Sequence, residues 1–219
     1  MMLRLAIALL AASLCGSAPA LAQLSPSTSG ISTAPTSAND EEYFYMLRQL
    51  GPCLASNKRD RAIAFLDAPI DSPQEAAAFD TLFGDTTNRC MQNFVSATLV
   101  RAWVRGVVAE GLFKDTMRDW PQGSVPAMEE PETVASIHDF ARCYVARDFA
   151  AARGLIEETR LGDKSELARM RELAPTFGPC MPQGAEVALK PMNIRMALAE
   201  ALYHATRNPG AARLPGQSD

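Results

Sequence analysis

The chain lacks the patterns of a membrane-spanning protein and of a nucleic-acid-binding protein. Its longest hydrophobic run, 5–14, covers ten residues and about 15 Å as a helix, roughly half of a bilayer core. Basic residues are not in excess, because 21 Lys and Arg face 25 Asp and Glu. We therefore expect no nucleic-acid partner, since that contact depends on a basic surface. With 47% hydrophobic and 21% charged residues over 219 positions, the composition is that of a globular protein.

The short motifs of enzyme and metal sites are also missing. The sequence has no Cys-x-x-Cys pair, which redox centres and zinc sites use, and no Gly-rich phosphate loop. The two histidines, His138 and His204, belong to no Ser-His-Asp or His-x-x-x-His pattern. These absences predict no cofactor and no bound metal, and they favour binding or structure over catalysis.

The first 22 residues have the pattern of a secretory signal peptide. Arg4 precedes the hydrophobic run, and the tripeptide Ala-Leu-Ala at 20–22 provides a small-x-small cleavage site. We expect a periplasmic or secreted protein with no integral membrane span after cleavage. Residues 23–39 are dominated by Ser, Thr, Pro and Ala, so they predict a disordered leader that buries too little apolar surface to fold.

Removal of the signal would leave four of the five cysteines. Cys53 and Cys90 are 37 positions apart, and Cys143 and Cys180 are again 37 apart, so a shift of 90 residues superimposes the pairs. An even number of cysteines in an oxidising compartment favours disulfides. Four cysteines permit three pairings, and a bridge copied from one ancestral unit predicts Cys53–Cys90 and Cys143–Cys180.

The same shift aligns the last part of each half. The pattern Arg-x-x-x-Ala-Glu-x-Leu-aromatic occupies 105–113 and returns at 195–203. Between 43–113 and 133–203, 11 of 71 positions are identical, and no gap is needed. The clustering of matches around the cysteines and one helix predicts an internal duplication.

The hydrophobic spacing and the capping residues predict an all-α fold of two tandem pseudo-repeats, with about four helices each, stapled by the disulfides. The expected division is a signal peptide (1–22), a leader (23–39), helical repeat 1 (40–118), a linker (119–130), helical repeat 2 (131–207) and a flexible tail (208–219).

Expected helices pair between the halves. The expected pairs are 40–50 with a helix from about 131, 58–68 with 148–159, 73–84 with 164–174, and 100–118 with 191–207. Short extended segments are expected at 94–99 and 185–190. Gly51-Pro52 should break or kink the first helix. Ser72 and Asp163 should cap the third pair, with Ser72 and Glu75 forming a capping box.

The most apolar helix of each half contains an arginine and a glutamate at matching positions: Arg105 and Glu110 in the first half, Arg195 and Glu200 in the second. Five positions correspond to about 140° around a helix, so Arg and Glu of one helix do not share a face. We interpret the four as a polar network in which arginines meet carboxylates or carbonyls of other helices. A pseudo-symmetric anion site is the alternative. A second alternative is a cell-envelope hydrolase, with Glu110 or Glu200 as a carboxylate of raised pKa.

The ending Arg-x-x-Leu-Ala-Glu-Ala-Leu-Tyr at 195–203, with a cysteine loop about fifteen residues before it, resembles uncharacterised secreted helical proteins of proteobacteria. The resemblance covers about half of the chain and implies export and helicity, but no activity. The favoured function is a binding or structural module with a protein or small-ligand partner in the envelope, the default site being a groove between the repeats. An envelope-associated interaction module with the leader as spacer remains a further hypothesis.

Overall fold

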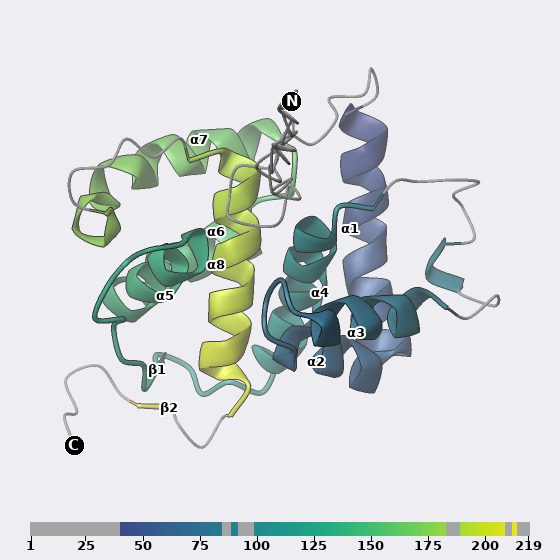
Figure 1. Cartoon of the computed structure of the whole chain (residues 1–219). Coiled ribbons are helices and arrows are strands. Elements are labelled where there is room, and N and C mark those ends of the chain that lie inside the picture. Colours follow the sequence, from purple (N-terminus) through teal and green to yellow (C-terminus); the bar gives the residue numbers. More distant parts are fainter. Residues whose placement is uncertain (1–39, 85–88, 92–98, 183–188, 209–211, 214–219) are drawn as a thin grey trace, which may run out of the picture.

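The structure is a computed structural model that describes residues 40–84, 89–91, 99–182, 189–208 and 212–213. Over these residues the chain is mostly helical (Figure 1). The expected signal peptide and leader lie outside the described residues. So do most of the tail and most of the two expected extended pieces.

The helices are α1 (Asp40–Asn57), α2 (Arg59–Asp67), α3 (Pro73–Phe83), α4 (Arg101–Thr116), α5 (Ile137–Arg147), α6 (Phe149–Glu158), α7 (Lys164–Leu173) and α8 (Pro191–Thr206). Short 3-10 turns are η1 (Arg89–Met91), η2 (Ala174–Thr176) and η3 (Gly178–Cys180). Two short strands, β1 (Val125–Pro126) and β2 (Ala212–Arg213), pair antiparallel and connect the segment after α4 with the segment after α8.

Four helices form a row in the order α1, α4, α8 and α5. Helices α4 and α8 lie side by side at the centre of the molecule, α1 packs on the outer side of α4, and α5 packs against α8 (Figure 1). Helices α2 and α3 pack together beside α1 and α4, and α6 and α7 pack together beside α5 and α8. The first four and the last four helices therefore form two groups that meet along the contact between α4 and α8.

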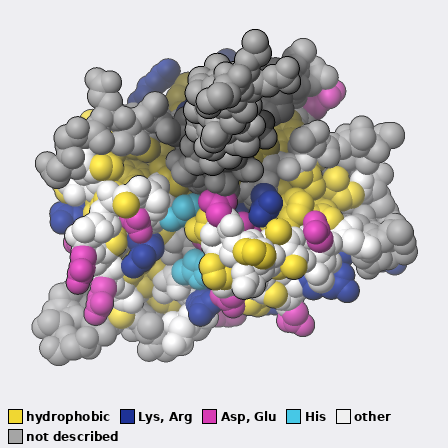
Figure 2. Space-filling model, viewed as in Figure 1, with side chains coloured by type: hydrophobic (Ala, Val, Ile, Leu, Met, Phe, Trp, Pro, Cys, Tyr) yellow, Lys and Arg dark blue, Asp and Glu magenta, His cyan; other side chains and the backbone are white. Residues whose placement is uncertain are grey.

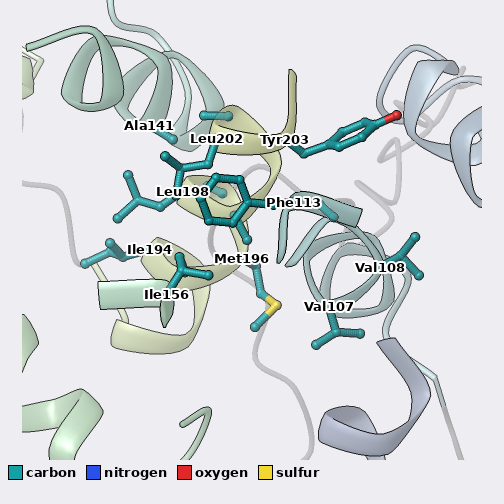
Figure 3. Close-up of a cluster of buried hydrophobic side chains, with 14 of the residues drawn as sticks. Val107, Val108, Phe113, Ala141, Ile156, Ile194, Met196, Leu198, Leu202 and Tyr203 are labelled. Carbon is teal, nitrogen blue, oxygen red and sulfur yellow. The ribbon is translucent and has the colours of Figure 1, made fainter. Parts of the chain in front are cut away.

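Apolar side chains make up much of the core between the two groups. Figure 3 shows its cluster of buried side chains, which includes Val107, Val108, Phe113, Ala141, Ile156, Ile194, Met196, Leu198, Leu202 and Tyr203. Helices α4 and α8 approach closely where Gly106 faces Met196, since a Cβ on Gly106 would lie 2.6 Å from the Met196 Cα atom. The contact that joins the groups is thus a close helix packing that a small residue permits.

Helix α1 continues through Gly51-Pro52, so the expectation of a break there is wrong. A proline inside a helix costs one backbone hydrogen bond and crowds the preceding turn, but its ring at Pro52 lies on the exposed face. The neighbouring Gly51 is buried against the backbone of Val107. Packing of α1 on α4 therefore maintains the helix across the proline.

Helix α5 begins at Ile137 and not near residue 131, because the chain has a strong helix start at Ser136. The Ser136 hydroxyl accepts a hydrogen bond from the Asp139 amide at 3.1 Å, and the Asp139 carboxylate accepts one from the Ser136 amide at 3.1 Å. As a result α5 has 11 residues against 18 in α1. The additional turns at the start of α1 contribute Glu41, Phe44 and Tyr45 to the lining of a groove.

The starts of α3 and α7 have the expected capping residues. Ser72 accepts from the Glu75 amide at 3.0 Å and Asp163 accepts from the Ser165 amide at 3.2 Å. The capping box at Ser72 is incomplete, because the Glu75 carboxylate accepts from the Asp71 amide instead, at 3.0 Å. The Glu75 carboxylate thus stays at the start of α3 and also lies 3.3 Å from Arg101 and from Arg105.

Two disulfides have the expected pairing. Cys53 is bonded to Cys90 and Cys143 to Cys180, with Cα–Cα distances of 5.5 and 5.7 Å. Each bridge joins the first helix of a group to the 3-10 turn that precedes its last helix. Each closes a loop of 37 positions, which stabilises the folded chain by about 4 kcal/mol in the chain-entropy model.

The local pairing makes each bridge separable from the other. Replacing Cys53 and Cys90 together by serine should give a homogeneous, less stable protein, whereas Cys53→Ser alone leaves a thiol that can mispair. Non-reducing peptide mapping and gel electrophoresis measure this. A peptide linking Cys53 to Cys143 or to Cys180 in the unmodified protein would contradict the pairing.

Candidate functional site

The four charged residues of the two central helices form two crossed pairs. Arg105 on α4 donates from Nε to Oε1 of Glu200 on α8 at 2.8 Å. Arg195 on α8 donates from Nε and Nη2 to the two carboxylate oxygens of Glu110 on α4, both at 3.0 Å. Each arginine therefore pairs with the glutamate of the other helix and not with that of its own helix, which lies about 140° away around the helix axis.

The rest of the Arg105 guanidinium is bound by the end of α2. Nη1 donates to the Phe65 carbonyl at 2.8 Å, and Nη2 donates to the Leu66 carbonyl. Nη1 also lies 3.3 Å from a carboxylate oxygen of Glu75. Carbonyl groups at the end of a helix carry partial negative charge, so this position stabilises the buried cation.

Arg195 repeats this arrangement in the second group and is completely buried. Its terminal nitrogens donate to the carbonyls of Leu155 and Ile156 at the end of α6, at 3.2 and 3.4 Å. These carbonyls stand 90 positions after those that bind Arg105. Thr159 accepts two more bonds, through its hydroxyl at 2.8 Å and its carbonyl at 3.2 Å.

These contacts occupy the donors that an anion site would need. Both guanidinium groups are 3% exposed or less and donate to carboxylates and carbonyls of the chain itself. A bound anion would have to displace a paired glutamate from a buried position, which is costly. The geometry thus favours a polar network that holds α4 and α8 together over an anion site at the arginines.

The two glutamates are held as anions. Burial opposes ionisation of Glu110, but the charges and hydrogen bonds of Arg195 and Lys114 outweigh it and lower its pKa. Burial is likewise outweighed at Glu200, where hydrogen bonds from His204 and Arg105 lower the pKa to about 2. The hydrolase hypothesis expects a raised pKa at one of these residues, and the shifts have the opposite sign.

Two further buried glutamates belong to the network and were not among the residues selected from the sequence. Glu75 lies against Arg101 and Arg105, each at 3.3 Å. Glu166 accepts from the Gly162 amide at 2.6 Å and lies 3.6 Å from Arg195, and burial raises its pKa. Both stand in the first turn of a helix, where a glutamate is commonly a capping acid, so the sequence offers little sign of a core position.

Both histidines of the chain lie at Glu200. His138 Nδ1 is 3.8 Å from one carboxylate oxygen and His204 Nε2 is 3.6 Å from the other. Burial lowers the pKa of His138. Histidine side chains reach the surface on the face that Figure 2 shows. No group of three or more metal-ligating residues suited to a metal ion occurs within the described ranges.

The low pKa of Glu200 predicts a loss of stability in acid. Its ordinary pKa is 4.5 and its folded value is about 2, so its contribution is complete above pH 4.5 and is lost as the pH falls towards 2. The shift corresponds to on the order of 3 kcal/mol. Urea unfolding at pH 6 and pH 3 should show a clearly smaller pH effect in Glu200→Gln than in the unmodified protein. Equal pH effects in the two proteins would contradict the assignment.

A groove of about 850 Å³ lies beside the network, between the two groups of helices. One wall is the exposed face of α1, the other is the 159–164 segment between α6 and α7, and α4 contributes Val107, Glu110 and Lys114. The groove therefore opens next to the Arg195–Glu110 pair, but that pair is already satisfied.

The two walls are held together by specific contacts. Arg48 on α1 donates to the Leu161 carbonyl at 2.8 Å. Gly162 has a positive φ of 76°, and a Cβ there would lie 2.6 Å from the Phe44 ring. Glycine is thus needed at this turn both for its backbone conformation and for its close approach to α1.

The groove also has an exposed aromatic residue. Tyr45 is 51% exposed, and the Arg48 guanidinium lies 6.0 Å from its ring centre. No local sequence pattern marks Tyr45 or Arg48, because their place in the groove depends on the approach of a segment more than 100 residues away.

Comparisons of the chain with known protein families, with curated proteins and with solved structures gave no match. Among the helices that the structure describes, none is long and apolar enough to cross a membrane.

Proposed function

We propose that the protein is an exported helical binding module that holds a small ligand in the groove between α1 and the 159–164 segment. The observation that carries the proposal is the groove itself. Its volume of about 850 Å³ lies within the usual range of small-molecule sites. Its lining combines aromatic and aliphatic side chains with charged ones.

Export is supported by the signal pattern at 1–22 and by the two disulfides, which persist in oxidising compartments. The resemblance of 195–203 to secreted helical proteins of proteobacteria points to the same location. We place the protein in the periplasm or outside the cell.

Duplication is the proposed origin of the two groups of helices. Arg105 donates to the carbonyls of Phe65 and Leu66. Arg195 donates in the same way to the carbonyls of Leu155 and Ile156. The disulfides recur at the same shift of 90 residues. A site between duplicated halves can diverge on one side only. Part of the groove is lined by the additional turns at the start of α1, which the shorter counterpart α5 does not have.

A cell-envelope hydrolase based on Glu110 or Glu200 is the weaker alternative. Each carboxylate is paired with an arginine in the helix packing, and each has a lowered pKa. A general acid needs the reverse. The binding proposal uses the same glutamates only as structural anions.

The test is capture of the natural ligand with a variant that fills the groove. Gln49 lines the groove on the exposed face of α1, so Gln49→Trp should exclude a ligand while leaving the core intact. Ser56→Trp is the matched control, because Ser56 is exposed two turns further along the same helix and does not line the groove.

Each protein is purified from the exported fraction of its native cells, and the small molecules released on denaturation are identified by mass spectrometry. We expect one compound to accompany the unmodified protein and Ser56→Trp but not Gln49→Trp. If no compound is present with Ser56→Trp and absent with Gln49→Trp, the proposed site is wrong.

A further inference from the structure

The charges around the groove differ in sign from the chain as a whole. Basic residues lining it are Arg48, Lys114, Arg160 and Lys164, and acidic residues lining it are Glu41, Glu110 and Asp163. The whole chain has a net charge of −4. The groove is therefore a locally basic site on an acidic protein.

Two of its three acids are already engaged. Glu110 is paired with Lys114 at 2.6 Å and with Arg195 at 3.0 Å, and Arg195 does not line the groove. Asp163 accepts from the Ser165 amide and caps α7. Only Glu41, at the start of α1, remains as an acid without such a contact among the described residues.

Two of the four basic residues are available to a ligand. Arg160 and Lys164 are exposed and stand at either end of the turn that forms one wall. Neither has an ion-pair partner in the part of the chain that the structure describes. Cations on a wall of a concave site attract and orient an anionic ligand.

The opposite wall is suited to an apolar group. Tyr45 exposes half of its surface, and Phe44 and Pro52 line the same side. The Arg48 guanidinium lies 6.0 Å from the centre of the Tyr45 ring and adds a positive charge to this wall. A ligand that satisfies both walls has an apolar body and a negatively charged head.

We infer that the groove binds a small amphipathic organic anion, with its acidic group toward Arg160 and Lys164 and its apolar body along Tyr45 and Pro52. The inference rests on the proposed function, because it assigns a ligand class to the same groove. It names the shared chemistry of an anionic head and an apolar body, which carboxylates, sulfonates and phosphate esters all provide.

The experiment uses two fluorescent probes with the full chain. The anion 8-anilinonaphthalene-1-sulfonate and the uncharged N-phenyl-1-naphthylamine share an aromatic body and differ in the sulfonate group. We expect the sulfonate probe to bind about tenfold more tightly, and its affinity to fall by a similar factor in Arg160→Gln/Lys164→Gln. Arg118→Gln/Arg171→Gln, which removes two exposed charges outside the groove, should leave the affinity unchanged.

Gln49→Trp separates the two levels of the proposal. If both probes bind equally well and both are lost in Gln49→Trp, the groove is a binding site but the anionic class is wrong. If Gln49→Trp binds the probes as the unmodified protein does, or if neither probe binds, the inference and the proposed groove both fail. If Arg160→Gln/Lys164→Gln weakens binding of the sulfonate probe but not of the uncharged probe, the result supports the inference directly.

Discussion

Replacement of Arg195 with methionine should lower the free energy of unfolding by about 3–5 kcal/mol. The side chain is completely buried and is the main partner of Glu110, and it also lies beside Glu166. Removing it takes one of two cations from Glu110, which keeps Lys114, and it also takes the nearby cation from Glu166 and the donor from several carbonyls. Urea unfolding followed by circular dichroism at pH 7 measures the change.

Arg153→Met is the matched control for this substitution. Arg153 pairs with Glu157 at 2.6 Å on the surface of α6, and such i,i+4 pairs contribute about 0.3–0.5 kcal/mol. A loss of less than about 1 kcal/mol in Arg195→Met, comparable to the control, would show that the buried pair contributes little to the fold.

Gly51→Ala should lower the free energy of unfolding by about 2–3 kcal/mol, although alanine is the better helix former. A Cβ at this position would lie 2.7 Å from the Val107 carbonyl carbon and even closer to the carbonyl oxygen. Backbone atoms cannot move aside by a side-chain rotation, so α1 would have to separate from α4. Thermal unfolding detects the change as a lower Tm.

The control for Gly51→Ala is Gly178→Ala. Gly178 lies on an exposed 3-10 turn, and a Cβ there has no neighbouring heavy atom within 4 Å. We expect its Tm to equal that of the unmodified protein. A Gly51→Ala protein as stable as Gly178→Ala would mean that α1 and α4 are not packed as closely as described.

Much of the local structure can be predicted from the sequence because it depends on nearby residues. The caps at Ser72 and Asp163 define where α3 and α7 begin, and the equal cysteine spacing is consistent with local bridges. The expectations at Pro52 and near residue 131 failed for different reasons. At Pro52, packing on α4 continues the helix past the expected break. Near residue 131, the later start depends on a local signal, the capping box of Ser136 and Asp139, which the hydrophobic spacing alone does not include.

The site is less predictable, because periodicity gives the direction of a side chain but not its partner. The angle between Arg105 and Glu110 on one helix indicates that they do not pair with each other. Arg105 pairs instead with Glu200, and Glu110 pairs with Arg195. These pairs across to α8 depend on how the two halves pack. The groove depends on the turn at Gly162 reaching Phe44, a contact between segments that no local pattern relates.

The network and the groove have different properties. Arginines and glutamates of α4 and α8 are saturated by one another and by backbone carbonyls, which suits a permanent contact between the halves. Arg160, Lys164 and Tyr45 remain exposed at the groove, which suits exchange of a ligand with solvent. The residues that repeat between the halves are therefore structural, and the proposed function belongs to residues that do not repeat.

A double-mutant cycle between Arg105 and the two glutamates tests the crossed network most directly. Arg105→Met and Glu200→Gln should couple by about 1–3 kcal/mol in urea unfolding, because the two side chains are bonded across the helices. Arg105→Met and Glu110→Gln should be additive to within about 0.5 kcal/mol, although these two residues share one helix. Strong coupling of Arg105 to Glu110, with none to Glu200, would contradict the crossed pairing that joins the two halves.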